Sequence, residues 1–400
     1  MTRARSVAIA GAGVAGLASA ILLSRAGWRV TVFERFERAR PVGSGLILQP
    51  PGMAVLDALG LGDRVREKGA PIRRLFGKSA GSDRVVLDVR YSALGGEGAH
   101  GVGLHRASLF DVLHGAALEE QVVIETGKAV LACPPLSGGR RELHFADGAS
   151  AGPFDLVIDA LGSRSALLSS PGRLLDYGAL WGTVLLPDRA DFQQAALEQR
   201  YLGARRMVGV LPIGDAPDAA RGRHAAFFWS LRHDRYDAWL QDGLDAWKAE
   251  VQALWPLARH LASQFADPAA LTFARYAHRT IANPAEAGLI HIGDAWRATS
   301  PQLGQGANMA LLDAYALAGA LRDRADLGEA LAAFVRRRRR HVLLYQAMSW
   351  LFTPFYQSDN RVLPLLRDRI AGPLARLPPA QRFLAVLVSG QLRGPLRGLE

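Results

Sequence analysis

Three glycines near the N-terminus are spaced in a way that suits a phosphate-bearing ligand. Gly11, Gly13 and Gly16 follow an apolar run, and Glu34 ends the next apolar run 18 residues after the last of them. In such a pattern the first glycine permits a tight turn, the second lets the backbone approach a pyrophosphate, and the third lets a helix pack closely on a strand. An acidic residue at this distance accepts hydrogen bonds from ribose hydroxyls. These residues therefore predict a dinucleotide site.

A second glycine-containing stretch, GDAWRATSPQLGQGANMALLDA, lies far along the chain. Here a buried run ends at Gly293 and Asp294, and a proline-containing loop leads through Gly304 and Gly306 into a long apolar helix. Asp294 stands at the carboxyl end of a predicted strand, where α/β sheets bind ligands. It can hydrogen-bond a ribose or ribityl hydroxyl. The backbone amides of 304–308 can face a ligand carbonyl that gains negative charge.

Regular elements must hold both stretches in place. Residues 6–10 are apolar and predict a strand, 14–27 have helical apolar spacing, and 28–34 predict the next strand, which together form a βαβ unit. An amphipathic helix is expected at 104–118, and a buried strand enters a glycine turn within 154–167. The first glycines thus fall between a strand and a helix, as pyrophosphate binding requires.

The pattern changes in the second half of the chain. From about 176 to 277 short alternating segments predict an antiparallel sheet with one face buried. The predicted fold is α/β: a Rossmann-like domain with a parallel sheet, an antiparallel-sheet domain and a helical C-terminal region.

Composition narrows the function classes for this chain of 400 residues with a net charge of +11. No uninterrupted apolar run reaches the roughly 18 residues of a membrane helix, and the polar start of the chain does not resemble a secretory signal. We expect a cytoplasmic protein. The lone Cys133 excludes intramolecular disulfides and thiolate metal clusters, so no metal site is predicted. No nucleic-acid recognition motif is present.

Much of the positive charge lies in the run Arg336 to Arg340. We interpret this run as a solvated turn of a helix. The C-terminal region after it is helical in pattern and interrupted by prolines, and we expect it to pack over the pocket as a lid. The alternative for both segments is contact with the inner face of an anionic membrane, because apolar residues follow the arginines closely. We expect a monomer or a homodimer.

The ordered set of motifs resembles the FAD-dependent aromatic monooxygenases of the para-hydroxybenzoate hydroxylase type over roughly residues 5–345. The resemblance rests on GAGVAG…FER, on the arginine of LHRASL, and on the second glycine-containing stretch, whose matching residues are the most specific part. It implies a family set of FAD-binding residues. At the matching positions these are Gly11, Gly13, Ala15, Gly16, Glu34, Arg35, Arg106, Val130, Asp159, Gly162, Asp294, Pro301, Gly304, Gln305, Gly306, Ala307 and Asn308.

The resemblance also implies a division of the chain. Residues 1–175 and 278–345 would form the FAD-binding domain, with an excursion into the substrate domain near 72–100. Residues 176–277 would form the substrate domain and 346–400 the helical C-terminal region. Within the substrate domain, Trp181, Phe227 and Trp229 are the candidate substrate contacts, and strand alternation would place Phe228 on the opposite face.

The implied reaction is hydroxylation of an aromatic or other electron-rich apolar small molecule. NADPH or NADH would reduce FAD, and O2 would give a flavin hydroperoxide that delivers one oxygen atom. No catalytic base is assigned: His224, His233 and His278 qualify by residue type alone. Leu161 occupies the position of a family aspartate that is tied to both FAD and NAD(P)H use. This departure leaves open an FAD-dependent oxidase or reductase, or a flavoprotein that a partner reduces.

Overall fold

The computed structural model describes residues 4–37, 44–95, 98–168, 172–187, 192–217, 219 and 222–396. Its first layer is a six-stranded sheet in the order β18-β19-β12-β1-β2-β8. All neighbours in it are parallel except β18 and β19. The strands are β1 (Ser6–Ala10), β2 (Arg29–Phe33), β8 (Val123–Glu125), β12 (Leu156–Asp159), β18 (Ala285–Glu286) and β19 (Leu289–His291).

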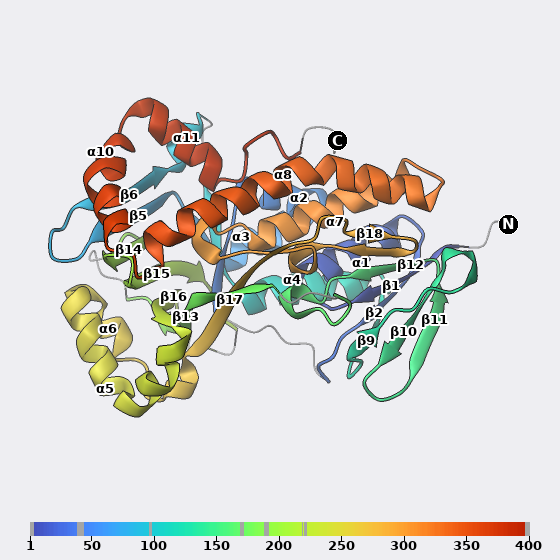
Figure 1. Ribbon diagram of the computed structural model, residues 1–400, viewed down its shortest axis with the longest axis horizontal. Coiled ribbons are helices and arrows are strands. Elements are labelled where there is room, and N and C mark those ends of the chain that lie inside the picture. The colour runs from blue at the N-terminus through green and yellow to red at the C-terminus, as the bar shows by residue number, and fades with distance from the viewer. Residues whose placement is uncertain are drawn as a thin grey trace.

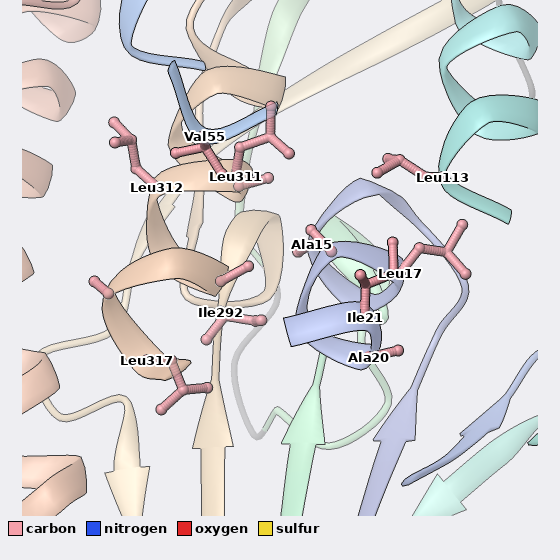
Figure 2. Packing of buried hydrophobic residues seen from close by; sticks show 14 of the residues in the cluster. Ala15, Leu17, Ala20, Ile21, Val55, Leu113, Ile292, Leu311, Leu312 and Leu317 are labelled. Carbon is pink, nitrogen blue, oxygen red and sulfur yellow. The ribbon is translucent and has the colours of Figure 1, made fainter. Parts of the chain in front are cut away.

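The central strands of this parallel sheet are apolar on both faces: helices cover one face, and segment 130–154 covers the other through Val130, Leu143 and Phe145. α1 connects β1 to β2, and α4 and α7 pack on α1, while α2 packs on α7. Figure 2 shows Ala15, Leu17 and Ile21 of α1 in the same core as Leu311 and Leu312 of α7. The bounds are α1 (Val14–Arg25), α2 (Pro50–Ala58), α3 (Gly62–Lys68), α4 (Arg106–Glu119) and α7 (Gly306–Arg322).

A second, eight-stranded sheet has the order β20-β17-β13-β16-β15-β14-β5-β6. Its pairs are antiparallel except for β14 with β5. Segment 72–100 contributes β5 and β6 to this sheet. The strands are β5 (Arg74–Ser79), β6 (Val85–Arg90), β13 (Arg173–Leu185), β14 (Ala196–Leu202), β15 (Arg206–Gly214), β16 (His224–Arg232), β17 (Thr272–Thr280) and β20 (Arg297–Ala298).

Two small sheets complete the strand content of the described residues. One is β9 (Val130–Ala132), β10 (Arg141–Phe145) and β11 (Ser150–Phe154), and the other is β3 (Gly45–Leu48), β4 (Ala70–Ile72) and β7 (Gly101–His105). The two large sheets lie at opposite ends of the molecule. α8 (Leu327–Tyr356) extends along the long axis, from the end with one sheet to the end with the other (Figure 1). The expected boundary at residue 345 therefore falls inside one continuous helix.

The remaining helices belong to the end of the molecule that holds the eight-stranded sheet (Figure 1). α5 (Tyr236–Leu254) and α6 (Arg259–Ala262) cover one face of that sheet with an apolar core of their own. After α8 come α9 (Val362–Leu366), a π-turn at Arg367–Ala371, α10 (Gly372–Leu374) and α11 (Pro378–Val388). Among the described residues, no helix combines the length and the apolar character of a membrane span.

Candidate functional site

The first glycine turn, between β1 and α1, leaves room for a ligand only on its outer side. Gly11 has a φ of 104°, and a Cβ at Gly16 would lie 2.0 Å from the carbonyl oxygen of Gly11. A Cβ at Gly13 would meet nothing within 4 Å. Gly13 is also the N-cap of α1 and carries no capping side chain. The open helix N-terminus therefore offers backbone amides and a positive dipole to an anionic group.

Glu34 ends β2 beside this turn. Its Oε2 accepts a hydrogen bond from the amide of Ala12 at 2.9 Å, and its Oε1 accepts one from the amide of Phe36 at 3.2 Å. The carboxylate is half-buried and keeps further lone pairs for a hydroxyl donor. Arg35 is exposed and lies over the ring of Phe36.

The second glycine-containing stretch meets the first in space. A Cβ at Gly293 would lie 3.1 Å from the Cβ of Ala15 in α1. Asp294, in the same 3₁₀ turn, is exposed at the cavity and has protein on its other sides. Desolvation by this surrounding protein raises the pKa of the carboxyl above its usual value, and the charges of Arg297 and Arg106 oppose that rise. Asp294 is thus a hydrogen-bond acceptor that the fold presents to a ligand.

A buried ion-pair cluster holds this turn, and the sequence analysis missed it. Asp313 of α7 accepts hydrogen bonds from the amide of Gly293 at 3.0 Å, from Nη1 of Arg297 at 2.9 Å and from Nε of Arg338 at 2.8 Å. All three side chains are buried. The interpretation of 336–340 as a solvated turn is wrong for Arg338, because that guanidinium neutralises a carboxylate in the interior.

Amide side chains fix the loop that precedes α7. Asn308 accepts from the amide of Gln49 at 2.7 Å and donates to the carbonyl oxygens of Ile47 and Gly304, each at 3.1 Å. Tyr91 donates to Oε1 of Gln49, whose Nε2 is buried and has no hydrogen-bond partner. That Nε2 lies close to Gly304, since a Cβ there would lie 3.9 Å from it. The donor therefore stays unused inside the wall, next to the second glycine loop.

Asp159 does not face the cavity. Its Oδ1 accepts from the amide of Leu161 at 3.0 Å, and its Oδ2 accepts from the hydroxyl of Ser165 at 2.6 Å and lies 2.7 Å from Nδ1 of His291. The side chain is fully buried. This carboxylate, which was predicted to contact FAD, is therefore engaged within the protein, where it serves the turn that contains Gly162 and the ring of His291.

One cavity of about 1260 Å³ lies between the two large sheets and the C-terminal helices. The predicted residues that line it are Arg106, Trp181, Asp294, Pro301, Gly304, Gln305, Gly306 and Ala307. Others lie outside its lining: the first glycine turn and Glu34, the buried Asp159, Asn308, which acts from behind the loop, and Val130, which packs in a core with Phe33 and Phe145. The sites predicted from both glycine stretches therefore adjoin, but only the second one forms the cavity wall.

Aromatic and apolar side chains form the opposite wall. Trp181 stacks near Phe228, with ring centroids 4.7 Å apart, and donates from Nε1 to the hydroxyl of Tyr276 at 2.7 Å. Tyr201 and Tyr356 lie with their centroids 5.4 Å apart. Burial raises the pKa of Tyr276 to about 12 and raises those of Tyr201 and Tyr356 as well. These phenols therefore stay protonated at neutral pH.

Phe227 and Trp229, which were predicted as substrate contacts, do not line the cavity, whereas Phe228 does. The alternation along β16 holds, but Phe227 and Trp229 face the other side of the sheet, where both pack against Trp247 of α5. Both faces of β16 are buried under aromatic side chains, so alternation alone could not say which face borders the cavity. None of the three candidate histidines lines it.

Within the described lining, β5, β6, β14, β15, β16 and α11 bring no charged side chain to this wall, whereas β17 brings Arg275 and Arg279 beside Tyr276. The contributions of β5, β6, β14, β15, β16 and α11 are Leu75, Leu87, Val89, Leu197, Gln199, Tyr201, Met207, Leu211, Phe228, Leu384, Leu387 and Val388. Gln305, on the cofactor side, donates to the carbonyl oxygen of Val388 at 2.6 Å and so ties the end of α11 to the second glycine loop.

Two adjoining glycine turns, of which the second lines a cavity, and an acceptor at the carboxyl edge of a parallel sheet are typical of a dinucleotide-binding protein with an attached apolar pocket. Comparison with known proteins agrees. Residues 4–133 match the family model described as FAD binding domain. A 3-amino-4-hydroxybenzoate 2-monooxygenase of Streptomyces cremeus is 32% identical over 330 residues, which cover 79% of this chain and 78% of that protein.

Two further comparisons cover nearly the whole chain. A probable 2-heptyl-3-hydroxy-4(1H)-quinolone synthase of Rhodococcus erythropolis is 26% identical over 93% of this chain and 92% of its own length. The crystal structure of HpxO from Klebsiella pneumoniae, in complex with FAD and uric acid, has a TM-score of 0.79 at 22% identity, covering 98% of both chains. The chain belongs to the FAD-dependent aromatic monooxygenases of the para-hydroxybenzoate hydroxylase type. It is an FAD-dependent enzyme that hydroxylates an aromatic small molecule.

Proposed function

We propose that this monooxygenase acts on an uncharged aromatic compound with an apolar substituent, such as an alkyl-substituted bicyclic ring. NADPH or NADH is the reductant and O2 the oxygen donor, so one oxygen atom enters the ring and the other leaves as water. FAD, when bound, supplies the electron transfer and oxygen activation. The relative named for a heptyl-bearing quinolone supports a substrate of this kind.

The proposal rests on the part of the cavity wall that β5, β6, β14, β15, β16 and α11 form, because no charged side chain of these elements lines the cavity. A carboxylated substrate held there would lose its hydration without gaining a cationic partner, which is costly. The arginines that line the cavity lie outside these strands and α11: Arg106 opens α4, Arg164 follows β12, and Arg275 and Arg279 belong to β17. Gln199 and the protonated tyrosines supply neutral hydrogen-bond partners for a carbonyl or hydroxyl of the ring.

We assign roles to the chain's own residues as follows. The amides around Gly13 and the carboxylate of Glu34 hold the pyrophosphate and adenosine ribose of FAD, and Asp294 holds the ribityl chain. The turn at Gly304 holds the edge of the isoalloxazine. Residues 1–175 and 278–345 then bind FAD, 176–277 with 72–100 bind substrate, and 346–400 close the cavity. We propose a cytoplasmic location.

Substrate-stimulated NADPH oxidation, with mass spectrometry for a gain of one oxygen atom, tests the proposal. We expect an alkyl-4-quinolone that lacks the ring hydroxyl to stimulate oxidation and to gain oxygen, and 3-amino-4-hydroxybenzoate to do neither. The reverse result would contradict the assignment of an uncharged substrate. Flavin bleaching by NADPH or NADH under nitrogen tests the reductant: if neither bleaches it, a partner protein reduces this enzyme.

A further inference from the structure

The segment that follows α8 exposes an apolar stripe to solvent. Val362, Leu366, Ile370, Leu374 and Leu377 succeed one another at intervals of four, four, four and three residues, from α9 through the π-turn and α10 to the N-cap of α11. Their exposed fractions lie between 42 and 60%. Such spacing keeps side chains on one side of a helix. A surface helix ordinarily turns this side toward the core, so the stripe points the opposite way from the usual arrangement.

The inner side of the same segment fixes this orientation. Arg367 is buried and donates to the carbonyl oxygens of Phe355 at 2.8 Å and Gly203 at 3.1 Å. Its guanidinium also lies over the rings of Tyr201 and Tyr356, whose centroids are 4.8 and 5.1 Å away. A Cβ at Gly372 would lie 2.9 Å from the carbonyl oxygen of Val85. Rotation that would bury the stripe breaks these contacts.

Positive charge accompanies the stripe. Residues 357–396 contain six arginines against two aspartates. The two aspartates are engaged locally: Asp359 accepts from Tyr177 and Arg232, and Asp368 accepts from Arg367. The arginines at the surface have no acidic partner within ion-pair distance among the described residues. They are Arg361, Arg369, Arg376, Arg382 and Arg393.

The adjoining half of α8 shows the same combination. Leu343, Trp350 and Leu351 are exposed, with Trp350 at 65%, and the exposed Arg339 and Arg340 precede them on the helix. α9 contacts α8, so the two apolar groups belong to neighbouring elements (Figure 1). Tryptophan, leucine and arginine on one helix are typical of helices that lie in a membrane interface.

We propose that the outer surface of α8–α11, defined by the exposed apolar and arginine residues named above, docks on an anionic lipid bilayer. Apolar side chains enter the acyl boundary, and the arginines pair with acidic headgroups. A second copy of the chain fits less well, because a two-fold interface sets a patch against itself and would bring the unpaired arginines of both copies together. Leu384, Leu387 and Val388 of α11 line the cavity on the inner side of this helix. Docking therefore brings the apolar wall of the cavity, the proposed substrate wall, close to lipid.

Co-sedimentation of the FAD-loaded protein with vesicles tests the proposal without turnover, so its result is independent of the substrate assignment. We expect wild type to bind phosphatidylglycerol–phosphatidylcholine vesicles at low salt and to dissociate as salt rises, because ions screen the arginines. Arg369→Gln/Arg376→Gln should weaken partitioning roughly 30-fold, from the contribution of each basic residue near an anionic surface. Leu366→Gln/Ile370→Gln/Leu374→Gln should bind still less.

Matched controls replace equally exposed residues elsewhere. Leu118→Gln/Leu131→Gln/Leu202→Gln removes three exposed leucines, and Arg235→Gln/Arg259→Gln removes two exposed arginines. Both should bind like wild type, with FAD content and melting temperature confirming folding in every variant. Absence of wild-type binding at low salt, equal loss in the controls, or a wild-type dimer that the leucine–isoleucine variant converts to a monomer would each overturn the proposal.

Discussion

The two walls of the cavity are built by different interactions. On the cofactor side, hydrogen bonds of fixed geometry join segments far apart in the chain, as Asp313 does for Gly293 and Asn308 for Gln49. On the proposed substrate side, rings and aliphatic chains from several strands and α11 pack mainly through apolar contact, with a few side-chain hydrogen bonds such as that from Trp181 to Tyr276. The cofactor wall therefore tolerates little change, whereas the substrate wall can alter its shape by single substitutions. This difference suits a family that keeps FAD and varies its substrates.

The strongest test of the rigid wall is Asp313→Ala. The substitution leaves Arg297 and Arg338 buried without their shared carboxylate, and breaking a buried ion pair in this way costs about 3–5 kcal/mol. We expect a large drop in the free energy of unfolding and loss of bound FAD, measured by denaturant titration and cofactor absorbance. Asp323→Ala, which breaks the exposed pair with Arg337, should change stability little. Equal effects would show that the cluster does not hold the turn.

The two faces of β16 offer the next comparison. Phe227→Ala should destabilise the fold by about 3–5 kcal/mol, because its ring fills the core against Trp247. Phe228→Ala enlarges a cavity that already exists, so its stability loss should be smaller, while the substrate KM should rise roughly tenfold or more through lost apolar contact. Urea titration and steady-state kinetics of both variants measure this. If only Phe227→Ala raises the KM, then Phe227 and not Phe228 contacts the substrate.

Asp294→Ala should weaken FAD binding by about 1.5–3 kcal/mol, the range for a lost hydrogen bond to a charged group. Asp159→Ala should instead lower stability, since its carboxylate serves Leu161, Ser165 and His291. Fluorescence titration of the apoproteins with FAD compares the two dissociation constants. If Asp159→Ala weakens FAD binding more than Asp294→Ala does, the ranking of the two carboxylates is wrong.

The smallest expected effect is a pH dependence of FAD affinity. Desolvation by the surrounding protein raises the pKa of Asp294, so this carboxyl takes up its proton at a higher pH than an ordinary aspartate. The ionised form is the better acceptor for ribityl hydroxyls. FAD affinity should therefore be constant above the raised pKa and decline as the pH falls through it. Asp294→Asn should remove this decline. If FAD affinity of that variant still falls at low pH as in wild type, another group is responsible for the pH dependence.

The turns of the cofactor wall were predictable because they depend on local spacing. Gly11, Gly16 and Gly304 stand where the backbone takes a positive φ or approaches another segment closely, and glycine is required there whatever surrounds it. The partners that lock these turns were not predicted, because Asp313 and Arg338 meet only through the packing of α7 on α8. One signal was present: Phe334, Arg338 and Val342 share a helical face, so Arg338 points with apolar residues.

For the proposed substrate wall, the sequence predicted the kinds of side chain but not which face of the sheet borders the cavity. Alternation separated Phe228 from its neighbours, but the side that borders the cavity depends on where α5 packs, and α5 follows the strand in the chain. The aromatic richness of this sheet was visible, and Trp181 was identified. The contribution of α11 had no sequence signal of its own, since a lid and a membrane-facing helix share the same amphipathic pattern.

The bond between Gln305 and the carbonyl oxygen of Val388 has a consequence for how the enzyme is made. Synthesis runs from the N-terminus, so both glycine turns, the parallel sheet and most of the substrate wall leave the ribosome before α11 does. Until α11 emerges, the cavity lacks one side and the loop at Gly304 lacks its last anchor. Cofactor can therefore load into a half-built pocket during translation, and completion of the chain then closes the pocket over it.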